Sequence, residues 1–201
     1  QACEGLAGVS ASQVEIQSGI QFYDGISTAE IQEILIKSAS DLIDLDHPNY
    51  QYVAARLLLF SVKKSLYGRM HDTPILKDHV VKCVEKGIYD EEILNLYDDE
   101  EFDKLQSIID HERDYLFTYA GLRQIVDKYL VQDRSTGALY ETPQFMYLLI
   151  SATIFSKYPK EVRLDYVKKY YDAISRHKIN IPTPIMAGVR TPLRQYASCV
   201  L

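Results

Sequence analysis

A cysteine and two hydroxyl side chains near the carboxyl end of the chain carry functional groups suited to redox and phosphate chemistry. Cys199 follows Ser198 in an apolar run, and Thr183 stands between two prolines. A thiol can cycle between reduced and disulfide forms, and a neighbouring hydroxyl can donate a hydrogen bond to a phosphate. Plainer roles also fit, because free cysteines are often buried as small apolar side chains and Thr183 could occupy a turn. These residues alone leave both interpretations open.

Thr28 and Lys64 form a second candidate site for a phosphorylated ligand. Thr28 stands at the start of a predicted helix, where a hydroxyl can cap the helix or bind a phosphate at the positive end of the helix dipole. Lys64 closes an apolar helix, where a cation complements the negative end of the dipole. Helix capping for Thr28 and an exposed helix end for Lys64 are the favoured interpretations on these residues alone.

Other kinds of site are excluded by the pattern of residues. The five histidines fall on different predicted elements without an HExxH motif or a Cys–His pairing, so no metal site is predicted. Neither a P-loop nor a G-x-G-x-x-G motif is present. Cys3, Cys83 and Cys199 lie far apart, which is typical of a reduced cytoplasmic protein rather than of a disulfide scaffold.

The amino-acid composition argues against two classes of binding partner, nucleic acids and membranes. The net charge of −6 argues against a nonspecific nucleic-acid binder, which needs a basic surface. The longest apolar stretch, residues 145–155, is too short to cross a bilayer. With 47% hydrophobic and 25% charged residues the chain is predicted to be a cytoplasmic globular protein without nucleic-acid or membrane partners.

The elements that must position these groups are predicted to be mostly helices. Apolar residues recur at helical spacing between capping residues, glycines and prolines. The predicted helices cover about residues 13–22, 28–45, 48–68, 76–86, 91–96, 99–110, 116–129, 143–157 and 159–178. Residues 1–6 have the pattern of the end of a helix, and the final apolar run stops without a turn, so both ends look truncated.

Two regions are predicted to contain extended chain. Residues 130–132 and 138–140 flank a loop that ends in Gly137, which is typical of a β-hairpin. Residues 179–186 and 195–201 have the pattern of two extended segments joined by a turn.

Five segments of the chain closely resemble large (catalytic) subunits of class I ribonucleotide reductases, most of all the aerobic enzyme of enteric-type bacteria. They are residues 21–26 (QFYDGI), 50–56 (YQYVAAR), 129–141 (YLVQDRSTGALYE), 183–192 (TPIMAGVRTP) and 194–199 (RQYASC). The resemblance therefore spans essentially the whole chain.

The resemblance implies that the parent protein reduces ribonucleoside diphosphates to deoxyribonucleoside diphosphates by thiyl-radical chemistry. It implies that Cys199 is the first member of a reducing cysteine pair, and that Thr183, Ser198 and Cys199 contact the substrate. It also implies a small subunit whose metal cofactor supplies the radical, a thioredoxin- or glutaredoxin-type reductant, and a homodimer. The other catalytic residues would lie beyond Leu201, so the chain by itself is expected to be inactive.

By the same resemblance, residues 1–69 are similar to the rear part of an ATP-cone, a helical module that senses ATP against dATP. Thr28 and Lys64 match its effector-binding positions. Gln32 and Ser61 depart from the related sequence, which has histidines there, and the cone's β-hairpin is missing from this chain. Binding of these effectors to the chain as given is therefore expected to be weak, and no cofactor bound in the chain is predicted.

The implied fold is mainly α (α+β). Residues 1–69 would form the partial ATP-cone, residues 70–178 a helical region with the β-hairpin, and residues 179–201 the first strands of a ten-stranded α/β barrel. The alternative is a non-catalytic helical regulatory module that binds a nucleotide or a protein partner. Two further active-site cysteines in the parent sequence would distinguish the reductase from that module.

Overall fold

A computed structural model describes residues 1–69, 73–193 and 196–198. Its helices are α1 (Ala11–Gly19), α2 (Thr28–Asp41), α3 (Tyr50–Tyr67), α4 (Leu76–Glu85), α5 (Glu92–Leu96), α6 (Asp99–Ile108), the 3-10 helix η1 (His111–Leu116), α7 (Tyr119–Lys128), α8 (Pro143–Phe155), α9 (Lys160–Ser175) and α10 (Thr183–Gly188). The prediction of a mainly helical fold is confirmed. No helix within the described ranges is both long and apolar enough to span a membrane.

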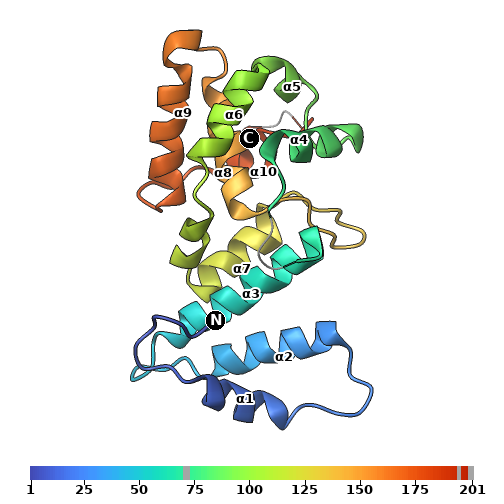
Figure 1. The fold of residues 1–201 in the computed structure, drawn as a ribbon, viewed down its shortest axis with the longest axis vertical. Helices are drawn as coiled ribbons and strands as arrows, with labels where there is room; N and C mark the ends of the chain where they lie inside the picture. Colours follow the sequence, from blue (N-terminus) through green and yellow to red (C-terminus); the bar gives the residue numbers. More distant parts are fainter. Residues whose placement is uncertain (70–72, 194–195, 199–201) are drawn as a thin grey trace.

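Helix α3 joins two hydrophobic cores. Val53 and Ala54 on one part of its surface pack with Val14 of α1 and Ala39 of α2. Leu59, which is fully buried, belongs to the larger core that includes α7 and α8. Figure 1 shows α1 and α2 at one end of the molecule, with α3 between them and α7. Because α3 is buried on both sides, the first three helices are packed onto the rest of the chain.

Helix α8 lies at the centre of the larger core. Every residue from Pro143 to Ala152 is buried, so this part of the helix is enclosed around its whole circumference rather than along one stripe. Thr142 precedes it, and Pro143 occupies the first helical turn, where a missing N–H costs nothing. Helix α9 packs alongside α8 through a face that includes Val167 and Tyr171 (Figure 1). This packing gives α8 a fixed position from which its polar residues can organise their neighbours.

The predicted β-hairpin is not formed as a pair of strands. Within the described residues, this region has only one isolated antiparallel bridge, between Gln132 and Leu139. Its turn is compact, because Gly137 adopts a φ of 73° and its N–H donates to the Asp133 carbonyl. The Val131 N–H is taken by the carboxylate of Glu141 at 2.8 Å. The Glu141 side chain therefore accepts the hydrogen bond that the Val131 N–H would donate to the opposite strand in a longer hairpin.

The carboxyl-terminal prediction was wrong for residues 183–188. They form helix α10, because Pro184 lies in the first helical turn, where proline is tolerated, and not in an extended strand. The first barrel strands are not shown: residues 196–198 are not in a strand, and the rest of the predicted run 195–201 lies outside the described residues. Residues 1–6 form turns and not the end of a helix.

Candidate functional site

Thr183 lies next to a tyrosine that the sequence analysis had not singled out. Thr183 is exposed at the start of α10, and its Oγ1 is 3.4 Å from the hydroxyl of Tyr129, the capping residue that directly follows α7. The side-chain amide of Gln124, one turn earlier on α7, donates to the Tyr129 hydroxyl at 3.4 Å. The hydrogen bond with Thr183 is the largest cause that lowers the pKa of Tyr129 from its usual value. Three neutral polar groups therefore form a chain at the surface.

A cavity of about 420 Å³ borders two of these three groups. Gln124 and Tyr129 line one part of it, and Asn180 and Met186, which flank Thr183 in the sequence, line another. Thr183 does not line this cavity, but its side chain is exposed to solvent.

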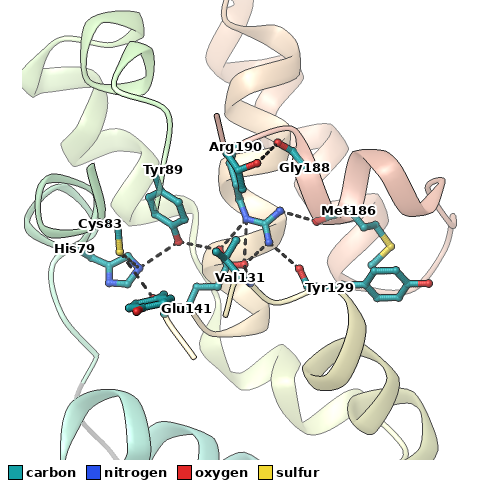
Figure 2. Close-up of polar contacts among 11 residues, drawn as sticks. His79, Cys83, Tyr89, Tyr129, Val131, Glu141, Met186, Gly188 and Arg190 are labelled. Carbon is teal, nitrogen blue, oxygen red and sulfur yellow. Dashed lines mark hydrogen bonds and ion pairs between the residues drawn. The ribbon is translucent and has the colours of Figure 1, made fainter. Parts of the chain in front are cut away.

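Both backbone segments of this site are held by one buried ion pair. Arg190 and Glu141 are fully buried, and their side chains pair through both nitrogens of the guanidinium edge, with Nε 2.7 Å from Glu141 Oε2. Arg190 Nη1 donates to the Met186 carbonyl of α10 at 2.5 Å, and Nη2 donates to the Tyr129 carbonyl at 2.9 Å. Figure 2 shows the guanidinium between these two carbonyls and the carboxylate. One side chain therefore ties α10 to the end of α7.

The same carboxylate organises a second group of polar residues on its other side. The Tyr89 hydroxyl donates to Glu141 Oε2 at 2.7 Å, and His79 Nε2 lies 3.3 Å from that hydroxyl (Figure 2). Burial lowers the pKa of His79 to about 4, so its ring is neutral at neutral pH. Burial also raises the pKa of Cys83 to about 12, which leaves an unreactive thiol. This group stabilises the packing and offers no nucleophile.

The other predicted residues near the carboxyl end are only partly located. Ser198 is described and exposed. Cys199 lies outside the described residues, so its catalytic role and its contact with the substrate stay predictions. Among the residues that the structure places, no three histidine, cysteine or acidic side chains are grouped to hold a metal ion.

Thr28 and Lys64 lie at the same end of an antiparallel pair of helices. The Gln32 side-chain amide donates to the Leu57 carbonyl at 3.0 Å, which aligns α2 against α3. Figure 1 shows the first turn of α2 and the last turn of α3 toward the same end of this helix pair. Thr28 and Lys64 are both exposed there. A hydroxyl and a cation are therefore exposed toward one end of this helix pair.

Ser27, and not Thr28, caps helix α2. The Ser27 hydroxyl accepts a hydrogen bond from the Glu30 N–H, and the Glu30 carboxylate accepts one from the Ser27 N–H. The favoured interpretation of Thr28 as the cap was therefore wrong, because the capping box begins one residue earlier. The Thr28 hydroxyl is not used as the side-chain cap.

A buried carboxylate lies where α3, η1 and α8 meet. Asp114 is almost completely buried, and its Oδ1 accepts a hydrogen bond from the Gln144 side chain at 2.8 Å. Its Oδ2 has no partner among the described residues. Burial raises the pKa of Asp114 to about 7, against the lowering effects of the Gln144 hydrogen bond and the charge of Lys63. Nothing in the local sequence marked this residue, because its environment comes from two distant helices.

Arg190 and Glu141 were also missed, although both lie inside the segments that carry the family resemblance. They are 49 positions apart, and no local spacing rule connects residues so distant. The available signal was a charged residue beside an apolar helix, namely Glu141 directly before Thr142 and Pro143. A carboxylate at such a position must find a cation or several donors once it is buried.

Comparison with known proteins confirms the resemblance seen in the sequence. Residues 2–65 match the ATP cone domain, and residues 115–194 match the ribonucleotide reductase all-alpha domain. Over 200 residues the chain is 56% identical to ribonucleoside-diphosphate reductase 1 subunit alpha of Escherichia coli (strain K12), and 58% identical to ribonucleoside-diphosphate reductase subunit alpha of Haemophilus influenzae. It is 45% identical over 196 residues to the corresponding subunit of Enterobacteria phage T4. These alignments cover 96–100% of this chain but only 26% of each relative.

Proposed function

We infer that this chain, with its ATP cone and its ribonucleotide reductase all-alpha domain, is the amino-terminal part of an alpha subunit that reduces ribonucleoside diphosphates to deoxyribonucleoside diphosphates. The observation that supports this inference best is the 56–58% identity, over 200 residues, to subunits of that name. The substrate class follows from those names, and the product would serve DNA precursor synthesis. Residues 1–69, 70–178 and 179–201 are proposed as the cone, the helical region and the start of the catalytic domain.

In this proposal Cys199 is one of two thiols that together supply two electrons when they join in a disulfide. The second thiol and the radical-bearing cysteine belong to the part of the subunit beyond this chain. A small partner subunit with a metal cofactor would supply the radical, and a thioredoxin- or glutaredoxin-type dithiol would reduce the disulfide after turnover. A second copy of the alpha subunit completes the proposed assembly.

Thr183 and Ser198 are proposed to hold the substrate largely through its diphosphate. Both are neutral hydroxyl donors, which bind phosphate oxygens without placing a further charge beside the ribose. The exposure of both side chains supports this role, because a ligand can reach them without displacing core residues.

In the complete alpha subunit, the cone is proposed to bind ATP or dATP as an allosteric effector. The match of residues 2–65 to the ATP cone domain supports this, and so does the exposure of Thr28 in the first turn of α2 and of Lys64 in the last turn of α3. Such a site would regulate the enzyme through α3, which also belongs to the core of the helical region.

The test is an assay of the complete alpha subunit that contains this chain. With the radical subunit, a dithiol and CDP it should form dCDP, and Cys199→Ser should abolish multiple turnover while the protein still folds. The 201-residue chain alone should form no deoxynucleotide under the same conditions. A complete subunit that binds nucleotide but forms no deoxynucleotide would instead support the non-catalytic regulatory module.

A further inference from the structure

Tyr129 connects the two features of the site, since its backbone contacts the buried ion pair and its hydroxyl contacts Thr183. We propose that Tyr129 is a positioning residue that orients the Thr183 hydroxyl, so that the Thr183 proton points toward the substrate's diphosphate. The inference rests on the proposed function, because it requires Thr183 to contact substrate. Gln124, Tyr129 and the Glu141–Arg190 pair are then the groups that orient the Thr183 hydroxyl toward the substrate.

For Thr183 to present its proton to the substrate, each hydrogen bond in the chain of groups must run in one direction. The Gln124 amide nitrogen can only donate, so it occupies an acceptor position on the Tyr129 oxygen. Either hydroxyl can donate across the 3.4 Å between the Tyr129 and Thr183 oxygens, and a positioning role assigns the donated proton to Tyr129. Once Thr183 accepts this bond, its own proton is available to an incoming phosphate oxygen. Each bond in such a chain also polarises the next, which strengthens the terminal donor.

The buried ion pair fixes the positions of the Tyr129 and Thr183 hydroxyls relative to each other. Arg190 binds the Tyr129 carbonyl on one side and the Met186 carbonyl on the other, and Met186 is one turn from Thr183 on α10. Glu141 neutralises the guanidinium and also binds the Val131 N–H, so the chain on the far side of Tyr129 is fixed as well. A planar guanidinium presents these donors in a rigid geometry that lysine could not reproduce. The separation of Tyr129 and Thr183 is therefore set in the core and not by exposed loops.

Tyr129→Phe tests the proposal, because it removes the hydroxyl and keeps the ring. In the complete alpha subunit we expect the KM for CDP to rise about 5-fold, the effect of one neutral hydrogen bond, with kcat within about 2-fold. The melting temperature should be unchanged, because the hydroxyl lies at the surface. Tyr166→Phe is the matched control: this tyrosine is exposed on α9 and should alter neither KM nor kcat.

A double-mutant cycle with Thr183 separates positioning from direct contact. Thr183→Val should raise KM, and Thr183→Ser should restore it, because serine keeps the hydroxyl. In the Thr183→Val background, Tyr129→Phe should have almost no further effect, since a positioning residue acts only through its partner. An equal effect of Tyr129→Phe in both backgrounds would overturn the proposal in favour of an independent contact.

Two other outcomes would also overturn it: no change in KM for Tyr129→Phe, or no change for Thr183→Val. Each is distinct from failure of the proposed function, in which the unsubstituted complete subunit would form no deoxynucleotide. A loss of melting temperature in Tyr129→Phe that accounts for the lost activity would mean that the hydroxyl is structural, and would likewise refute the positioning role.

Discussion

Replacement of Asp114 by asparagine should make the stability of the chain less dependent on pH. Asp114 has a pKa of about 7 in the folded chain, against 3.8 when unperturbed. Between these values the folded chain keeps a proton that the unfolded chain has released. The stabilisation is therefore fully present below pH 3.8 and is lost as the pH rises through 7. The full difference of about three pKa units corresponds to about 4 kcal/mol, of which about 3 kcal/mol falls between pH 5 and pH 8.5.

Asparagine suits this test because it keeps the shape of the side chain and the oxygen that accepts from Gln144. It cannot ionise, so the charged form is never buried. At pH 5 the variant should be no more stable than the parent, since its amide leaves a buried donor where Oδ2 has no partner. Relative to the parent, its free energy of unfolding should rise by about 3 kcal/mol from pH 5 to pH 8.5.

The assay is urea unfolding of the 201-residue chain, followed by circular dichroism at both pH values. Burial lowers the pKa of His79 and of His111 to about 4, so their contributions run in the opposite direction and are lost as the pH falls from 6.5 to 4. These contributions are common to parent and variant and cancel in the difference. Asp103→Asn, at an exposed position of α6, is the control, and its difference from the parent in free energy of unfolding should not change with pH. Parallel pH profiles for the parent and Asp114→Asn would refute the reasoning.

The remaining predictions concern the ion pair, the cone and the redox cysteine. Glu141→Gln should lower the free energy of unfolding by about 3–5 kcal/mol in the same urea assay, because Arg190 is left as a buried unpaired cation. The double variant Glu141→Gln with Arg190→Met should lose less free energy of unfolding than the sum of the two single variants. Calorimetry of ATP or dATP with the chain should give a dissociation constant weaker than about 100 μM, and tighter binding that disappears in Lys64→Ala would contradict this. In the complete subunit, Cys199→Ser should reduce multiple turnover by several orders of magnitude at an unchanged melting temperature, whereas near-normal turnover with a lowered melting temperature would identify Cys199 as a buried structural residue.

The helices were predictable because their signals are local. Capping residues, prolines in first turns and apolar spacing lie within a few positions of one another, and α4 begins and α5 ends at the expected residues. The errors arose where one signal fits two structures. The prolines around Thr183 suit an extended chain and also the first turn of a helix, and packing of Met186 against the core selected the helix α10.

The amino-acid sequence by itself determined the helical class, the family resemblance and the identity of Thr183 as a candidate contact. Only the tertiary structure decided which groups lie beside it. The Arg190–Glu141 pair spans 49 positions and the Tyr129–Thr183 contact spans 54, so no spacing rule could connect them. The pKa of Asp114 likewise depends on Gln144 and Lys63, which reach it from two other helices. Burial and hydrogen bonding depend on distance in space, which becomes defined only when α3, α8 and α10 pack together.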